Sequence, residues 1–276
     1  MRRSVKLNPL FEYRVLERFW RNADELGFSG VYTFDHFYGL REGDAGPLEA
    51  WTILAAMAAA TSRVRIGCLV TAVTFRHPVV LAKMAVTVDH ISGGRLDLGL
   101  GAGWHQGEHE AYGIAFPPAG TRIAMLEEAC MLIRRLWAED QVDHQGRYWT
   151  LRGARCDPKP LQRPIPLVVA GSGERKTLPV VAKHADEWSF PGGDLQDGPA
   201  RFARLSAILD GHCQAVGRDP TTVRRSVTLL LHPEQPAQLR RQVGLVGQYE
   251  QRGADHVILG FSTPPAGDVL ASLAPS

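Results

Sequence analysis

The first chemically suggestive feature is a glycine-rich stretch over residues 92–113. Gly99, Gly101 and Gly103 remove the side chain at every second position, after a short apolar strand and before the start of a helix. Glycine permits positive φ and close approach of a ligand to the backbone. A loop that opens into a helix also presents unpaired N–H groups at a positive dipole end. A planar or anionic ligand could therefore lie on this loop, and a tight strand-to-helix turn is the alternative.

Asp35 and His36 place a carboxylate beside an imidazole at the end of another expected strand. Neighbours in an extended segment point in opposite directions, so the two side chains need not contact each other. The imidazole titrates near neutrality and suits proton transfer or polarisation of a substrate. An ordinary loop histidine is the simpler interpretation.

A second glycine loop, residues 171–174, is expected to open a helix at Glu174. Its backbone N–H groups, the Ser172 hydroxyl and the helix dipole could hold a phosphate. Arg175 and Lys176 add positive charge next to the loop. The alternative is a turn before a solvated helix start.

His105, Glu108 and His109 match the H-x-x-E-H pattern of some zinc peptidases. That pattern needs a helix already formed across it, and Gly107 interrupts the motif directly after a glycine loop. Polar residues at a helix start explain the motif better, so no metal site is predicted.

The elements that must position these residues alternate between strand and helix. Strands are expected at residues 4–7, 30–34, 65–70, 96–100, 167–170, 187–190, 225–231 and 256–260. Helices are expected at residues 11–26, 48–60, 78–91, 121–137, 174–184, 201–216 and 236–252, with a hairpin at 142–151 and a linker at 157–166. About eight such alternations in one chain favour a closed (β/α)₈ barrel as a single domain over residues 1–276.

The chemistry-bearing segments all follow expected strands: residues 35–37, 71–76, 101–108, 171–174 and 188–193. In such a barrel these loops share the C-terminal face, where active sites are found. Their clustering at one face strengthens the prediction that each segment contributes to a functional site.

Composition excludes several classes of protein. The 276 residues are 45% hydrophobic and 22% charged, as in an ordinary globular protein, and a net charge of +2 does not indicate nucleic-acid binding. Residues 1–10 contain basic residues but no apolar stretch, so no signal peptide is expected there, and no apolar run is long enough to span a membrane. The four cysteines form no Cys-x-x-Cys pair and suit a reducing cytoplasm; they are Cys68, Cys130, Cys156 and Cys213.

Several segments together resemble the luciferase-like monooxygenase superfamily, and most closely its branch of deazaflavin (coenzyme F420)-dependent oxidoreductases. The matching segments are residues 25–37, 61–67, 74–78, 81–83, 89–95, 99–104, 108, 111–113, 122, 126–128, 136–137, 171–173, 185–188 and 216–220. Each is weak by itself, but the ordered set covers most of the chain.

The resemblance implies a (β/α)₈ barrel that binds FMN or F420 at its C-terminal mouth. Asp35 and His36 would face the ring, and a non-proline cis peptide would fall at Cys68-Leu69 or Leu69-Val70. The phosphate would lie on the 171–174 loop. The implied cofactor-binding residues are Cys68, Leu69, Thr71, Ala102, Gly103, Trp104, Gly171, Ser172, Gly173 and Glu174.

One position departs from the family pattern. Trp104 stands where some deazaflavin sugar dehydrogenases carry an acidic glutamate, and an indole cannot act as that acid. This puts sugar substrates in doubt and leaves His36 or Glu108 as the acid, with Asp35 as the third catalytic candidate. The short first strand and a short loop after Gly193 suggest an open mouth.

The expected function is hydride transfer between F420 and a small organic substrate. The alternative is an FMN-dependent monooxygenase that takes reduced flavin from a separate reductase. A non-enzymatic flavin-binding protein and a zinc hydrolase at His105 and His109 are further alternatives. A homodimer is compatible with the resemblance, although the sequence leaves the oligomeric state open.

Overall fold

Eight parallel strands close into a barrel in the computed structural model, which describes residues 1–39, 46–192 and 197–275. The strands follow one another in chain order around the barrel, and the last pairs with the first. They are β1 (Arg2–Leu7), β2 (Gly30–Thr33), β3 (Arg65–Ala72), β4 (Leu96–Gly101), β7 (Leu167–Ala170), β8 (Glu187–Phe190), β9 (Arg224–Leu231) and β10 (His256–Phe261). The expected (β/α)₈ barrel is confirmed.

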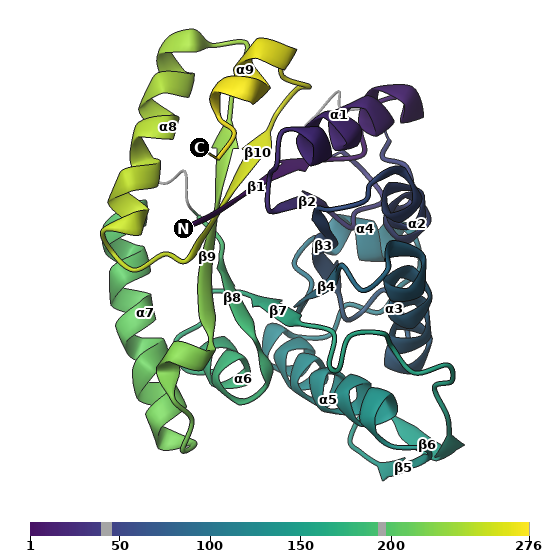
Figure 1. The fold of residues 1–276 in the computed structure, drawn as a ribbon. Coiled ribbons are helices and arrows are strands. Elements are labelled where there is room, and N and C mark those ends of the chain that lie inside the picture. Colours follow the sequence, from purple (N-terminus) through teal and green to yellow (C-terminus); the bar gives the residue numbers. More distant parts are fainter. Residues whose placement is uncertain (40–45, 193–196, 276) are drawn as a thin grey trace.

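Helices pack around the outside of this barrel, as Figure 1 shows. The main ones are α1 (Tyr13–Glu25), α2 (Ala50–Ala60), α3 (Pro78–Ser92), α5 (Ala119–Ala138), α6 (Thr177–His184), α7 (Gly198–Ala215) and α8 (Pro236–Glu250). The α3 helix illustrates how local sequence sets the bounds. Pro78 occupies its first turn, and Gly93 follows its last residue with a left-handed φ of 67°. None of the helices in the described ranges is long and apolar enough to cross a membrane.

Some elements differ from the sequence expectation. The first strand is not short, because all six residues of β1 pair with β10. A short helix, α4 (Gln106–Ala111), forms where the sequence predicted a helix start without giving its bounds. A second short helix, α9 (Gly267–Ser272), was not predicted. The helix expected from Glu174 begins only at Thr177, because a turn intervenes.

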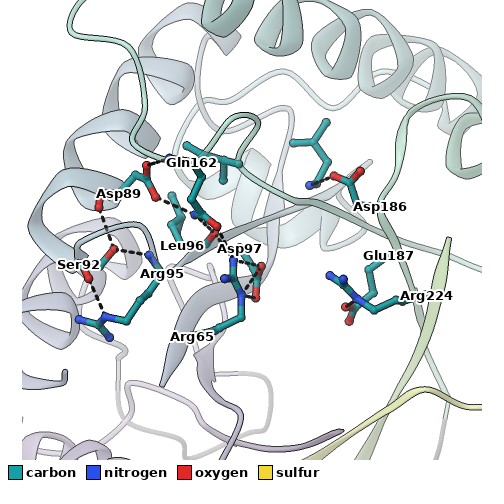
Figure 2. Close-up of polar contacts among 12 residues, drawn as sticks. Arg65, Asp89, Ser92, Arg95, Leu96, Asp97, Gln162, Asp186, Glu187 and Arg224 are labelled. Atoms are coloured by element: carbon teal, nitrogen blue, oxygen red, sulfur yellow. Dashed lines mark hydrogen bonds and ion pairs between the residues drawn. The ribbon is translucent and has the colours of Figure 1, made fainter. Parts of the chain in front are cut away.

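The hairpin and the linker are tied to the barrel by carboxylates. The hairpin forms from β5 (Val142–Gln145) and β6 (Thr150–Ala154), beside one end of α5 in Figure 1. Glu128 of α5 accepts hydrogen bonds from three backbone N–H groups in the turn between β5 and β6. Asp89 likewise accepts from the backbone and side chain of Gln162 in the proline-rich linker (Figure 2).

Polar side chains close the N-terminal end of the barrel interior. Arg65 pairs with Asp97 at 2.6 Å, and Arg224 pairs with Glu187 at 3.1 Å (Figure 2). Glu187 also bonds to the His256 ring at 2.9 Å. Burial alone would raise the pKa of Glu187, but His256, Ser226 and Arg224 outweigh it and lower the pKa to about 2. These polar side chains occupy the barrel interior at this end, and the cavity described below lies at the opposite end, among the loops that follow the strands.

The outer core fixes one of the glycine loops. Trp188 of β8 is fully buried and stacks on Phe202 of α7, with ring centroids 5.6 Å apart and planes 10° apart. Its indole N–H donates a 2.8 Å hydrogen bond to the carbonyl of Gly171. Packing between β8 and α7 therefore positions the loop that follows β7.

Candidate active site

A cavity of about 650 Å³ opens among the loops at the C-terminal ends of the strands. This volume lies in the range of small-molecule and cofactor sites. Of the residues expected at the site, Asp35, His36, Leu69, Ala102, Gly103, Trp104, Glu108, Gly171 and Ser172 line it. Residues 189–192 also line it, whereas Gly193 lies outside the described residues.

His36 and Glu108 form a pair in the wall of this cavity. Nδ1 of His36 lies 2.7 Å from Oε2 of Glu108. The other carboxylate oxygen accepts hydrogen bonds from the backbone N–H groups of Phe37 and Tyr38 at 2.6 and 3.1 Å. Glu108 thus holds both the imidazole and the loop that carries it.

The electrostatics fix the protonation of this pair at neutral pH. Burial lowers the pKa of His36, and the bond to Glu108 only partly opposes it. Burial alone would raise the pKa of Glu108, but the hydrogen bonds from His36 and the loop outweigh it and lower the pKa. A neutral imidazole therefore donates Nδ1–H to a carboxylate, and Nε2 carries the lone pair. No described residue makes a hydrogen bond to Nε2.

Asp35 does not contact His36 and instead pairs with Arg76. The guanidinium donates to both carboxylate oxygens of Asp35 and also contacts Glu49. Burial raises the pKa of Asp35, with Arg76 and the Thr71 hydroxyl opposing the shift. Trp51 donates to the same hydroxyl at 2.9 Å. Asp35 is therefore suited to orienting the loop after β2. The separation of Asp35 from His36 agrees with the expectation that neighbours in an extended segment point in opposite directions.

Gly99 has a different role from the one the sequence suggested. A Cβ on Gly99 would lie 2.0 Å from the carbonyl oxygen of Cys68, so glycine here lets β3 approach β4 rather than a ligand. The register of β3 against β4 shifts between Cys68 and Thr71. The Leu69-Val70 peptide in this segment is cis, at one of the two places that the resemblance implied.

Trp104 stands at the mouth of the cavity, 64% exposed. Its ring lies edge-on to His36 and to His105, with centroids 5.6 and 5.1 Å away. His105 caps α4 by accepting from the Glu108 N–H, and His109 bonds through Nε2 to Thr74 and through Nδ1 to the His105 carbonyl. Both histidines therefore make hydrogen bonds within the protein. Within the described ranges, no group of three or more His, Cys, Asp or Glu residues could hold a metal.

The 171–174 loop differs in part from the expected phosphate cradle. The Gly173 carbonyl accepts hydrogen bonds from the N–H groups of Thr177 and Leu178, in the first turn of α6, at 2.9 and 3.0 Å. These helix N–H groups are therefore not open to a phosphate. Gly171 and Ser172 do line the cavity, and the Arg201 guanidinium donates to the Ser172 hydroxyl at 3.3 Å. An anion at this end would meet Ser172 and Arg201.

Four residues expected to bind the cofactor lie outside the cavity lining. Cys68 is 1% exposed, and burial raises the pKa of its thiol well above its usual range. Thr71 is buried against Trp51, as described above. The Gly173 carbonyl is bonded to the first turn of α6, and Glu174 is exposed and pairs with Arg204 at 2.9 Å. Contact of these four with a cofactor stays a prediction.

Sequence reasoning missed the polar groups at the C-terminal end of β1 and directly after it. Lys6 and Asn8 line the cavity, and the Lys6 ammonium donates to the Leu69 carbonyl at 2.9 Å. Alternation gives the signal that could have found them: Val5 and Leu7 are buried in the outer core, so Ser4 and Lys6 point into the barrel. A lysine inside a barrel strand is rare unless it has a function or a partner.

The residues present suit a flavin or deazaflavin. Apolar and small groups from β3 and the loop after β4 could accept a planar ring, and the Ser172–Arg201 end could accept an anionic tail. Gly171 adopts a φ of 147°, and a Cβ there would meet the Thr177 methyl at 2.5 Å, so the cradle has no room for a side chain. The chemistry of the lining therefore fits the cofactor implied by the resemblance.

Comparisons with known proteins find relatives of two kinds, an F420-dependent dehydrogenase and a monooxygenase. The F420-dependent glucose-6-phosphate dehydrogenase of Kineococcus radiotolerans is 34% identical over 222 residues, which cover 78% of this chain and 63% of the relative. The pyrimidine monooxygenase RutA of Cronobacter sakazakii is 34% identical over 175 residues, 62% of this chain and 50% of the relative. The matched segments thus span about half to just under two thirds of these relatives' own length.

The fold has close counterparts among solved structures. An F420-dependent secondary alcohol dehydrogenase in complex with an F420-acetone adduct superimposes with a TM-score of 0.84 and 19% identity, over 99% of this chain and 97% of that one. At this identity the likeness concerns the fold. The sequence model of the luciferase-like monooxygenase family matches residues 3–263, nearly the whole chain. The chain therefore belongs to the luciferase-like monooxygenase family.

Proposed function

We propose that the protein is an F420-dependent oxidoreductase that transfers a hydride between the deazaflavin and a small organic substrate. The observation that carries this proposal is the His36–Glu108 pair in the cavity wall, with Nδ1 and Oε2 2.7 Å apart. Interconversion of an alcohol and a carbonyl needs a proton to move together with the hydride. An imidazole with one nitrogen held and the other available suits that task.

Each side chain of the site has a defined part in this function. His36 Nε2 accepts a proton from the substrate during oxidation and returns it during reduction. Glu108 holds Nδ1–H and stabilises the imidazolium that forms when Nε2 takes a proton. Asp35 and Arg76 keep the loop after β2 in place. Bound F420 would supply the two-electron hydride carrier.

The two ends of the cavity would bind different parts of the cofactor. Ser172 and Arg201 would hold an anionic group of the cofactor, and the residues from Ala102 to Trp104 would lie along its ring. Trp104 at the mouth would exclude water from the reacting atoms. F420 is preferred because the 99–104 segment followed by Glu108 resembles the deazaflavin branch, and a relative of 34% identity is F420-dependent.

An FMN-dependent monooxygenase is the second candidate. The observation that favours it is the match to the pyrimidine monooxygenase, whose identity of 34% equals that of the dehydrogenase. In that case the same cavity would hold reduced flavin from a separate reductase, and the protein would consume oxygen.

Parallel titrations of the purified protein with F420 and with FMN separate the two candidates. Isothermal calorimetry should give a Kd for F420 at least about tenfold lower than that for FMN. The reverse order, together with oxygen consumption in the presence of reduced FMN, would favour the monooxygenase. Binding of neither cofactor would refute both.

A further inference from the structure

The proposed chemistry leaves one cation of the cavity unexplained. Lys6, the second-to-last residue of β1, is partly buried and lines the cavity. Its ammonium donates one hydrogen bond, to the Leu69 carbonyl at 2.9 Å. No carboxylate of the described ranges lies within ion-pair distance of it. An ammonium has three N–H donors, so two lack a protein acceptor in this part of the chain.

The acidic groups of the cavity are already committed to other partners. Asp35 pairs with Arg76, and Glu108 is used by His36 and the backbone of the same loop. Withdrawal from water lowers the pKa of Lys6 to about 8, opposed by its interaction with the Cys68 thiol. Holding an unpaired cation in such a place costs stability. A ligand anion would supply the missing partner.

Asn8 adds a second polar group to the same wall. It lies two residues beyond Lys6 and also lines the cavity. Its Oδ1 is buried and has no hydrogen-bond partner among the described residues. A buried amide oxygen without a partner is uncommon in folded proteins. The amide is therefore available to turn and offer its N–H groups to a ligand next to Lys6.

The position of β1 separates this pair from the anion-binding end at Ser172. Around the closed barrel, β1 and β7 are four strands apart in either direction, so they stand on opposite walls. Ser172 follows β7, whereas Lys6 reaches from β1 towards β3. An anionic tail held at Ser172 and Arg201 would therefore leave Lys6 for a different ligand. His36 follows β2, the strand next to β1, so the proposed reacting centre lies near the β1 wall.

We propose that Lys6 and Asn8 form a carboxylate-binding subsite, and that the substrate is a small organic acid whose carboxylate rests on the β1 wall. The identity of this acid as the oxidoreductase substrate rests on the proposed function, whereas the subsite itself does not. A carboxylate held there would direct the rest of the substrate towards His36 Nε2. Charge-assisted hydrogen bonds of this kind are among the stronger ones in proteins.

The chain is well suited to a direct test, because it has five lysines in all: Lys6, Lys83, Lys159, Lys176 and Lys183. Protein labelled with ¹³C at the lysine ε carbon gives five signals, and the variant Lys6→Arg identifies that of Lys6. The probes are benzoate and benzamide, which have nearly the same shape and differ in charge. Benzoate is expected to shift the Lys6 signal and to raise its pKa above about 8, and benzamide is not.

Matched variants separate a role of the charge from a role in folding. Lys6→Met should weaken benzoate binding by about ten- to a hundredfold and leave benzamide unaffected. Lys183→Met makes the same change at an exposed position paired with Glu127, and should leave both probes unaffected. Asn8→Asp keeps the side-chain shape but places a negative charge beside Lys6, so it should also weaken benzoate binding. Thermal unfolding should show that Lys6→Met is no less stable than the wild type, because it removes an unpaired cation.

The result that would overturn the subsite is a Lys6 signal that benzoate does not move, or benzoate affinity unchanged in Lys6→Met. A shift caused by inorganic phosphate and not by benzoate would assign Lys6 to a phosphate and refute the carboxylate. All these measurements use protein without cofactor. The subsite can therefore fail while F420 still binds, or stand while neither F420 nor FMN binds, so the two proposals are tested separately.

Discussion

Oε2 of Glu108 lies 2.7 Å from Nδ1 of His36, so a residue of α4 fixes the orientation of an imidazole that follows β2. The two residues are 72 positions apart in the sequence. Both oxygens of Glu108 are engaged, and its pKa is lowered below the usual range. Glu108 is therefore a positioning residue that stays ionised, and the proton-transfer role falls to His36.

Replacing Glu108 by glutamine tests this division of roles. Gln keeps the size of the side chain but removes the negative charge that stabilises an imidazolium. Burial already lowers the pKa of His36, and loss of the charge should lower it further. Turnover should fall about ten- to a hundredfold, and the acidic limb of the pH profile for substrate oxidation should move to lower pH. An unchanged pH profile in a folded Glu108→Gln protein would contradict the role given to Glu108.

The glycine cradle at the anion-binding end gives a second prediction. A Cβ on Gly173 would lie 2.8 Å from the Thr177 hydroxyl, so Gly173→Val must displace the loop that presents Ser172. Cofactor affinity should fall by at least about tenfold, measured by calorimetry, while circular dichroism shows an intact fold. Gly244→Val serves as the control, because an added Cβ in that part of α8 meets nothing within 4 Å. Unchanged affinity in a folded Gly173→Val protein would remove the loop from cofactor binding.

The polar end of the barrel predicts an acid-dependent loss of stability. The pKa of Glu187 falls from 4.5 to about 2 on folding, so the unfolded chain binds its proton more readily. The resulting stabilisation, roughly 3 kcal/mol by linkage, is complete above about pH 5 and is lost as the pH falls through 4.5 towards 2.

Thermal unfolding between pH 2 and pH 7 checks this. The variant Glu187→Gln should be less stable than the wild type at pH 7, because His256 and Arg224 lose their anionic partner. Below pH 5, the stability of this variant should also fall less with decreasing pH than that of the wild type. Parallel curves for the two proteins across that range would show that Glu187 does not carry the effect.

The barrel could be predicted from the sequence because its signals are local. The run from Pro78 to Gly93 contains both the start and the stop of a helix, and the alternation of strands and helices repeats along the chain. Because parallel strands in a barrel end at one face, the order of the elements also placed His36, Trp104 and Ser172 around one cavity.

The partners inside the site could not be predicted, because they depend on distances between separate loops. Spacing does not show that His36 bonds to Glu108 rather than to Asp35, its neighbour in the chain. Gly99 is a signal of close approach, but the approaching group is the Cys68 carbonyl and not a ligand. Lys6 is noticeable only once the inward face of β1 is known.

The most direct test of the central claim is the rate of F420 reduction in the His36→Ala variant, recorded by absorbance without oxygen. A panel of small alcohols and hydroxy acids would be mixed with wild-type and variant protein at saturating F420, so that lost binding is not mistaken for lost chemistry. His36→Ala should lower turnover about a hundredfold. Trp104→Phe should lower it less, and Asp35→Asn should fall between the two. Full turnover in a correctly folded His36→Ala protein would contradict the assignment of His36 as the proton-transfer group.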